Sequence, residues 1–236
     1  MTTGIAGRAI VEPDPASLAR RTAQWLVERA NATTGRFRLA LSGGSTPRLL
    51  YRLLATDMPS ARPELFWGDE RFVPQNHPDS NYRMAREEWL SHADIPRGQV
   101  HPIPTDTDPN DCARRYEATL KSAYGADALD PARPLFDVAL QGLGSDGHTA
   151  SLLSGQPVLD ERARWVAPVM QGRAEPRITL TYPALESSRA VIFLVTGADK
   201  RDAVRRAREG DQSLPAGRLK PQGETIWFLD DAAAGL

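Results

Sequence analysis

The sequence predicts an α/β protein built on an open, mostly parallel, doubly wound sheet of the Rossmann-like kind, with helices on both faces. Short β-rich runs alternate along the chain with helical patterns, which is typical of βαβ units. The 236 residues are 41% hydrophobic and 25% charged, the proportions of a globular chain that can bury a core. No internal repeat or linker-like change of composition interrupts the alternation, so we expect a single domain over residues 1–236.

Five runs are expected to form strands. Each is rich in aliphatic, β-branched or aromatic residues, is short enough for one strand, and lies next to a polar or Gly-containing turn. The five runs cover residues 37–41, 65–68, 136–140, 191–195 and 225–228.

The segments between these runs carry the apolar spacing of helices. Asp108 can cap a helix that begins at Pro109, and Pro47 stands at a first helical position, where its missing N–H costs nothing. We expect helices over residues 16–32, 47–55, 81–91, 109–124 and 198–209, and a shorter one from Thr149 to about Ser154. Loops are expected over residues 75–80, 102–107 and 214–223, which are polar and contain proline.

Charge and cysteine usage exclude several classes of protein. Lys and Arg number 29 against 30 Asp and Glu, so no global field favours nucleic acid or a membrane surface as a partner. Cys112 is the one cysteine, which excludes an intramolecular disulfide and fits a reducing compartment. Residues 1–15 lack the pattern of a secretory leader, and no apolar run is long enough to cross a bilayer, so we expect a cytoplasmic protein.

Three of the four histidines, His77, His92 and His101, have no spacing that suits a metal site, so we expect no metal.

A first candidate site is the Gly-rich turn of residues 42–46, which joins an expected strand to an expected helix. The amides of a first helical turn lack intrahelical partners and the helix dipole is positive there, so this turn can hold an anion. The Lys of a Walker A loop is absent, which disfavours a nucleoside triphosphate and favours a simple phosphomonoester. The alternative is a tight turn that needs Gly only for its backbone angles.

A second Gly-rich turn, residues 142–147, follows the strand expected at 136–140. It formally matches Gly-x-Gly-x-x-Gly, but the helix expected after it is short and no clear ribose-binding acid follows, which disfavours a dinucleotide site. His148 lies at the N-terminus of that expected helix, where the helix dipole would favour the neutral form of its imidazole, as suits a general base. The alternative is that His148 only caps the helix. Asp146 can fix the tautomer of His148 or face the substrate.

Charged residues also follow other strands. Asp69, Glu70 and Arg71 come directly after the run 65–68, at the sheet edge where open α/β sheets bind ligands; the alternative is a solvated charge cluster. Arg177 lies in an extended segment and Lys200 opens a helix. Each is either a countercharge for a phosphate or an ordinary surface cation.

Five segments together resemble the 6-phosphogluconolactonase family. The segment DGHTAS, with SGGSTP upstream of it, is typical of the superfamily that contains the lactonases and the glucosamine-6-phosphate isomerases. The segments GDER, DSNY and GHTASL narrow the resemblance to the lactonases. Related glucosamine-6-phosphate deaminases and isomerases have a further acid shortly after the histidine, where this chain has Leu153. The segments are SGGSTP (42–47), GDERFVP to HPDSNYRMA (68–85), GLGSDGHTASLL (142–153), RITLT (177–181) and TGADK (196–200).

The resemblance implies hydrolysis of 6-phospho-D-glucono-1,5-lactone to 6-phospho-D-gluconate, in the oxidative pentose phosphate pathway, without a cofactor. It implies His148 as general base, with Asp146 and Arg71 as further catalytic residues, and amides near residues 144–147 or Arg71 at the oxyanion. The substrate-binding residues would be Ser42, Gly43, Gly44, Ser45, Thr46, Asp69, Gly144, Arg177 and Lys200. The alternatives are an enzyme like the glucosamine-6-phosphate isomerases and deaminases, or a non-catalytic sugar-phosphate sensor; association with glucose-6-phosphate dehydrogenase stays open.

Overall fold

A seven-stranded parallel sheet forms the centre of the computed structural model, which describes residues 6–59 and 63–236. The strand order is β1-β10-β9-β6-β2-β3-β5, and each neighbouring pair is parallel. The sheet confirms the predicted fold class. Its strands are β1 (Arg8–Glu12), β2 (Phe37–Leu41), β3 (Pro63–Trp67), β5 (Val100–His101), β6 (Phe136–Gln141), β9 (Ser188–Val195) and β10 (Glu224–Asp230).

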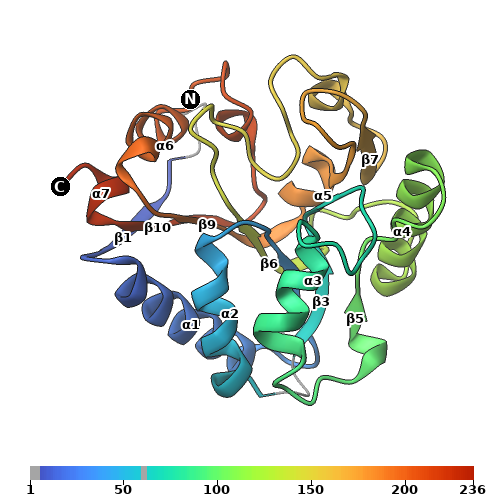
Figure 1. The fold of residues 1–236 in the computed structure, drawn as a ribbon, viewed down its shortest axis with the longest axis horizontal. Coiled ribbons are helices and arrows are strands. Elements are labelled where there is room, and N and C mark those ends of the chain that lie inside the picture. Colours follow the sequence, from blue (N-terminus) through green and yellow to red (C-terminus); the bar gives the residue numbers. More distant parts are fainter. Residues whose placement is uncertain (1–5, 60–62) are drawn as a thin grey trace.

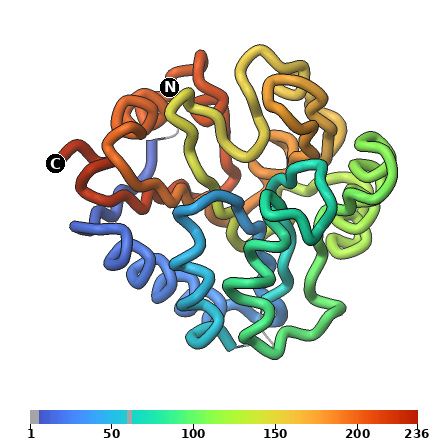
Figure 2. The backbone as a smooth tube through the Cα atoms, in the orientation of Figure 1, coloured from blue at the N-terminus to red at the C-terminus, as the bar shows by residue number. Residues whose placement is uncertain are grey.

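Helices cover both faces of this sheet (Figure 1). In that view α1 and α2 lie below the strands β1, β10 and β9, and α6 lies above them. Figure 2 shows the same layering along the backbone, with the blue α1 and the orange-red α6 on opposite sides. The helices are α1 (Pro15–Ala32), α2 (Thr46–Asp57), α3 (Asn81–Ala85), α4 (Pro109–Tyr124), α5 (Tyr182–Glu186), α6 (Arg201–Arg208) and α7 (Asp231–Ala234).

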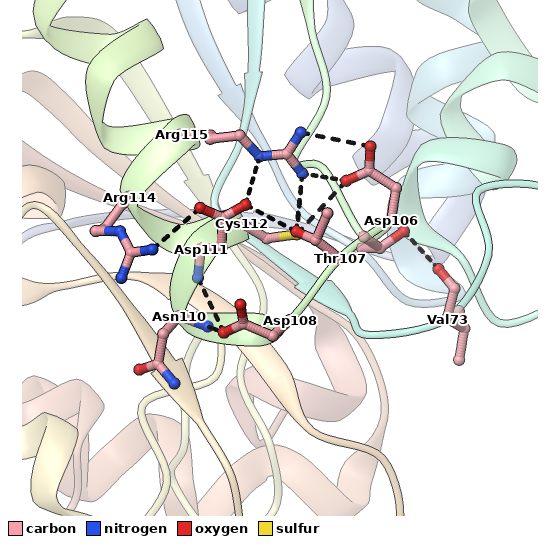
Figure 3. A network of polar contacts seen from close by, with 10 residues as sticks. Val73, Asp106, Thr107, Asp108, Asn110, Asp111, Cys112, Arg114 and Arg115 are labelled. Carbon is pink, nitrogen blue, oxygen red and sulfur yellow. Dashed lines mark hydrogen bonds and ion pairs between the residues drawn. The ribbon is translucent and has the colours of Figure 1, made fainter.

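The predicted start signal of α4 is present, and a glycine ends the helix. The carboxylate of Asp108 accepts hydrogen bonds from the backbone N–H groups of Asn110 (2.9 Å) and Asp111 (3.2 Å), and Asp111 pairs with Arg114 at 3.1 Å (Figure 3). Gly125 ends the helix in the left-handed conformation with φ 80°. Both ends of the predicted helix 109–124 are therefore confirmed.

A second, antiparallel sheet was not predicted. It consists of β4 (Asp69–Arg71), β8 (Arg177–Leu180) and β7 (Val166–Val169), in the order β4-β8-β7. Gly68 joins it to the parallel sheet, because its N–H donates to Leu41 O (2.8 Å) and its carbonyl accepts from Leu180 N (2.8 Å). Residues 69–71 therefore leave the parallel sheet as an edge strand of the second one.

The helix expected from Thr149 is wrong. The Thr149 hydroxyl lies 2.8 Å from Gln141 Oε1 and 2.9 Å from Gly142 O, Thr149 bridges to Leu152, and Ala150 turns left-handed at φ 46°. Hydrogen bonds to the preceding strand thus replace a helical ladder.

Other boundaries differ less from the prediction. The helix expected over 81–91 is α3 followed by a π-helical turn (Arg86–Leu90), and the one expected over 198–209 is a 3₁₀ turn (Ala198–Lys200) followed by α6. The expected loop 214–223 contains a further 3₁₀ turn (Ala216–Arg218). Two strands of the parallel sheet were not predicted: β5 has only two residues, too few for a periodic signal, and β1 is as long as β2 but has no fully buried residue.

The core is one contiguous cluster of buried apolar side chains, in which Trp67, Trp89 and Trp227 are almost fully enclosed. Among residues 6–59 and 63–236, none of the helices is both long enough and apolar enough to cross a membrane. The first five residues, on which part of the expectation about a leader depends, lie outside the described residues.

Candidate active site

The candidate site lies where the chain reverses its direction across the parallel sheet. β2 and β6 are neighbours, but the chain leaves β2 toward β3 and leaves β6 toward β9. In open α/β sheets such a reversal opens a crevice at the carboxyl ends of the strands, and ligands bind there. Loops that follow β2, β3, β6 and β9 line a cavity of about 260 Å³ at this point.

This cavity brings together the predicted site residues from five separate segments. Asp146 is the one predicted member outside the lining, and it reaches the cavity through His148. The predicted residues in the lining are Ser42, Gly43, Gly44, Ser45, Thr46, Asp69, Arg71, Gly144, His148, Arg177 and Lys200.

The Gly-rich turn 42–46 is held from both sides. The buried Tyr51 hydroxyl donates to Ser42 O at 2.7 Å and accepts from Ser42 N at 3.0 Å. The hydroxyls of Thr46 and Thr196 lie 3.1 Å apart and link the turn to the loop after β9. Ser45 precedes α2 without a side-chain cap bond, so no Ser45 side chain covers the amides at the start of α2, where Arg48 N donates to Ser45 O at 3.3 Å.

Gly43 is needed because another side chain takes the space of a Cβ. A Cβ there would lie well under 3.0 Å from the side-chain amide of Asn81. Asn81 Nδ2 in turn donates to Asp69 O at 2.9 Å, and its Oδ1 accepts from Arg71 Nη1 at 3.2 Å. Asn81, which the site prediction missed although it lies within the DSNY motif, therefore connects the Gly-rich turn to the charged residues of β4.

His148 is hydrogen-bonded to Asp146 and lies beside Arg173. The Nδ1–Oδ1 distance is 2.5 Å, which places the ring proton on Nδ1 and leaves Nε2 as the free acceptor. Arg173 Nη2 donates to the other Asp146 oxygen at 3.0 Å and lies 3.2 Å from His148 Nδ1. Partial burial raises the pKa of the Asp146 carboxyl, but hydrogen bonds from His148 and Arg173 lower it by more, so it stays ionised.

The helix-dipole effect expected at His148 is wrong, because the structure has no helix there. No helix begins at Thr149, so His148 owes its geometry to a tight turn instead, in which Gly144 N donates to His148 O at 2.8 Å. A Cβ on Gly144 would lie well under 3.0 Å from both His148 Nδ1 and Asp146 Oδ1. The second Gly-rich turn therefore makes room for the histidine–aspartate pair.

Arg71 and Arg177 are direct neighbours across β4 and β8, and both line the cavity. Like charges opposite each other destabilise a sheet unless an anion compensates them. The side chain of Arg177 is only 15% exposed, and its buried Nε has no hydrogen-bond partner among the described residues. Burial lowers the pKa of Arg177, the charge of Asp69 opposes this, and the charge of Arg71 adds to it.

Asp69, on β4 with Arg71, is a hydrogen-bond acceptor whose carboxylate is held in place. It is 8% exposed, and the buried Ser151 hydroxyl donates to its Oδ2 at 2.6 Å. Ser151 N also donates to Thr179 Oγ1 at 3.2 Å, so the loop after His148 is docked on β8. Ser151 was missed because its partner is 82 positions away in the sequence.

Glu70 supports the site from outside the cavity. It is 1% exposed and accepts hydrogen bonds from the backbone N–H groups of Arg71, Asn81 and Tyr82 and from the Ser80 hydroxyl, at 2.7–3.1 Å. Burial raises its pKa to about 7 against the opposing effect of the backbone donors. Glu70 therefore holds the start of α3 and, with it, Asn81.

Lys200 completes the cationic lining. Its Nζ lies 3.2 Å from Asp199 Oδ2. The turn that carries it is fixed by Asp230, the last residue of β10, whose two carboxylate oxygens each lie 3.1 Å from Gly197 N.

Comparisons with known proteins give the family. The family model for glucosamine-6-phosphate isomerases and 6-phosphogluconolactonase matches residues 13–227. The 6-phosphogluconolactonase of Synechocystis sp. is 44% identical over 212 residues, which are 88% of this chain and 87% of that protein. The structure of 6-phosphogluconolactonase from Trypanosoma cruzi matches with a TM-score of 0.85 at 29% identity, covering 98% of this chain and 97% of its own.

A monomeric glucosamine-6-phosphate deaminase matches with a TM-score of 0.79 at 20% identity, covering 97% of this chain and 99% of its own, a likeness that shows the fold alone. The resemblance inferred from the motifs is confirmed: the chain belongs to the family of glucosamine-6-phosphate isomerases and 6-phosphogluconolactonases.

Proposed function

We propose that this chain hydrolyses 6-phospho-D-glucono-1,5-lactone to 6-phospho-D-gluconate, with His148 as the general base and one cationic cavity for the substrate. One observation carries the proposal. A histidine with its Nδ1 proton fixed by a carboxylate shares a cavity of about 260 Å³ with two arginines, Arg71 and Arg177, that are partners in the register of β4 and β8. Lactone hydrolysis on a phosphorylated sugar needs these two elements: an activated water and groups that stabilise negative charge.

The first step is attack of water on the lactone carbonyl. Because Nδ1–H of His148 donates to Asp146, the unprotonated Nε2 takes a proton from the water as its oxygen bonds to C1. The charge of Asp146 stabilises the imidazolium that results. Asp146 thus has an orienting role, which the sequence left open against direct substrate contact.

The tetrahedral intermediate carries a negative oxygen, and Arg71 is the group we assign to it. The N–H groups of Gly144 and Gly147 already donate within their own turn, to His148 O and Gly144 O. Arg71 lines the cavity, and its Nη1 is fixed by Asp79 O (2.8 Å) and Asn81. When the C1–ring oxygen bond breaks, imidazolium Nε2 returns its proton to the leaving ring oxygen, and His148 is neutral again.

The 6-phosphate is assigned to the Gly-rich turn 42–46 with Arg177 and Lys200. The amides at the start of α2 and two cations suit a dianion. The unpartnered, buried Nε of Arg177 supports this assignment, because buried donors are nearly always satisfied by a ligand, a water or the protein. Asp69, held by Ser151, is assigned to a sugar hydroxyl.

The alternative of a deaminase or isomerase lacks support at one position. Leu153, which stands where the related enzymes have a further acid, is 4% exposed within the apolar core. A sensor without catalysis would not need the fixed tautomer of His148. We further propose that residues 1–236 act as one domain in the cytoplasm, on a small sugar-phosphate lactone and without nucleic acid or membrane partners.

The test is an assay on freshly generated 6-phosphogluconolactone, with spontaneous hydrolysis subtracted. Wild type should accelerate hydrolysis, and His148→Ala should lower kcat by about 10² to 10⁴-fold with KM little changed, because a general base contributes on that scale. A correctly folded wild type that gives no acceleration would refute the proposal. Ammonia release from glucosamine 6-phosphate would then support the deaminase instead.

A further inference from the structure

We infer that Arg173 is a positioning residue of the reaction, which acts by holding Asp146 in the orientation that fixes His148. The inference rests on the proposed function and adds to it a residue that no motif indicated. Arg173 lies in the segment between β7 and β8, far from Asp146 in the sequence.

The two oxygens of Asp146 are divided between two partners. Oδ1 accepts from His148 Nδ1 at 2.5 Å and from His148 N at 3.2 Å, and Oδ2 accepts from Arg173 Nη2 at 3.0 Å. A carboxylate rotates about its Cβ–Cγ bond, and its side chain here is 52% exposed. The bond to Arg173 removes this freedom and keeps Oδ1 directed at the imidazole.

The surroundings of Arg173 favour this role over direct substrate binding. Arg173 is not among the residues that line the cavity, whereas Arg71 and Arg177 are. Its remaining hydrogen bond goes from Nη1 to Gly172 O, within its own exposed segment. Arg173 therefore reaches the catalytic group through Asp146.

Arg173 contacts Asp146 through a single nitrogen, so the role requires one charged hydrogen-bond donor at this place. Nη2 makes both the bond to Asp146 and the 3.2 Å approach to His148, and the interaction is not bidentate. An ammonium group can supply one charged donor as well as a guanidinium can. Arg173→Lys should therefore restore what Arg173→Gln loses.

Kinetics on the lactone test the role against a matched control. Arg173→Gln should lower kcat about three- to tenfold with KM within twofold of wild type, the effect of one partly exposed charge-assisted hydrogen bond. Arg173→Lys should recover most of the loss. Arg164→Gln removes an arginine that likewise pairs with a single carboxylate, that of Glu161, away from the cavity, and should leave both constants unchanged.

A double-mutant cycle separates action through Asp146 from action on the substrate. In an Asp146→Ala background, the further change Arg173→Gln should alter kcat less than 1.5-fold, because coupled residues are not additive. Three results would each overturn the inference: full kcat in Arg173→Gln, a rise of KM in that variant, or an undiminished loss in the Asp146→Ala background.

A readout without turnover keeps this inference separate from the proposed function. The chain has only four histidines, so ¹⁵N spectra of the imidazoles can be assigned by comparison with His148→Ala. Arg173→Gln should reduce the Nδ1-protonated tautomer of His148, and Arg173→Lys should restore it. An unchanged tautomer would refute the positioning role even if the lactone were not the substrate, and an inactive wild type with the expected spectra would refute the substrate alone.

Discussion

Adding one methyl group at Gly144 should disable the catalytic pair and leave the fold in place. The Cβ of Gly144→Ala would overlap His148 Nδ1 and Asp146 Oδ1, which are the two atoms of the 2.5 Å hydrogen bond. Backbone conformation does not oppose the change, because Gly144 is not among the glycines with positive φ. The side chains must therefore move.

The size of the effect follows from the geometry. Separating the new Cβ from both atoms requires a shift of about 1 Å, and a misplacement of that size can cost about 10²-fold in rate. We expect kcat to fall by about 100-fold with a small change in KM. Overpacking usually costs about 1–3 kcal/mol, and we expect the low end because His148 is partly exposed and can rotate away.

The assay is lactone hydrolysis together with thermal unfolding, and Gly142→Ala is the comparison. A Cβ at Gly142 in the same turn meets only Ser42 Oγ, at an ordinary 3.6 Å. That variant should keep kcat within about threefold, the scale of a change that leaves the reacting groups in place. If Gly144→Ala kept wild-type kcat, the fixed His148–Asp146 geometry would not matter for the reaction, and the proposed role of Asp146 would be wrong.

Three further outcomes are expected. Arg177→Gln should raise KM by about tenfold or more, with a smaller effect on kcat, because a charged partner of the phosphate is lost; substrate titration measures this, and an unchanged KM would contradict the assignment. Glu70→Gln should lower the free energy of unfolding at pH 8 by about 2–6 kcal/mol in denaturant titration, because two buried donors lose their acceptor at about 1–3 kcal/mol each; a loss well below this would mean that the loop relaxes. The pKa of Asp146 is lower in the folded chain than its ordinary 3.8, so its carboxylate stabilises the fold above pH 3.8 and this contribution is lost as the pH falls further. Asp146→Asn should therefore weaken the dependence of the free energy of unfolding on pH in acid, and the same pH dependence in wild type and variant would contradict the lowered pKa.

The inner strands of the parallel sheet (β10, β9, β6, β2 and β3) were predictable because their signals are local. The strand 37–41 and the helix 109–124 match the structure at both ends, since each is bounded by a capping or turn residue that acts on its immediate neighbours. The same holds for the Gly-rich turn 42–46, whose residues meet at one loop whatever the rest of the chain does. Such features need no knowledge of distant partners.

The missed features depend on contacts between distant segments. The small sheet pairs Asp69 with Thr179, and its register alone places Arg71 against Arg177. The expected helix at Thr149 failed because Thr149 and Ser151 bond to Gln141 and Asp69 instead of to their own turn. A single sequence carries no sign of these pairings, so the composition of the site was predictable while its arrangement was not.

Three departures from the rules of stable folds meet at this one cavity. Arg71 and Arg177 carry like charges across a strand pair, Arg177 Nε is buried without a partner, and Ala150 is the one residue other than glycine with positive φ among residues 6–59 and 63–236. Each costs stability in the free protein. A bound dianion would compensate the first two, and the turn at Ala150 carries Ser151 to Asp69. The two charge-related departures are therefore placed where a negatively charged substrate relieves them, and a lactone without the phosphate would leave Arg177 with its 3.8 Å contact to Glu175 as its ion pair.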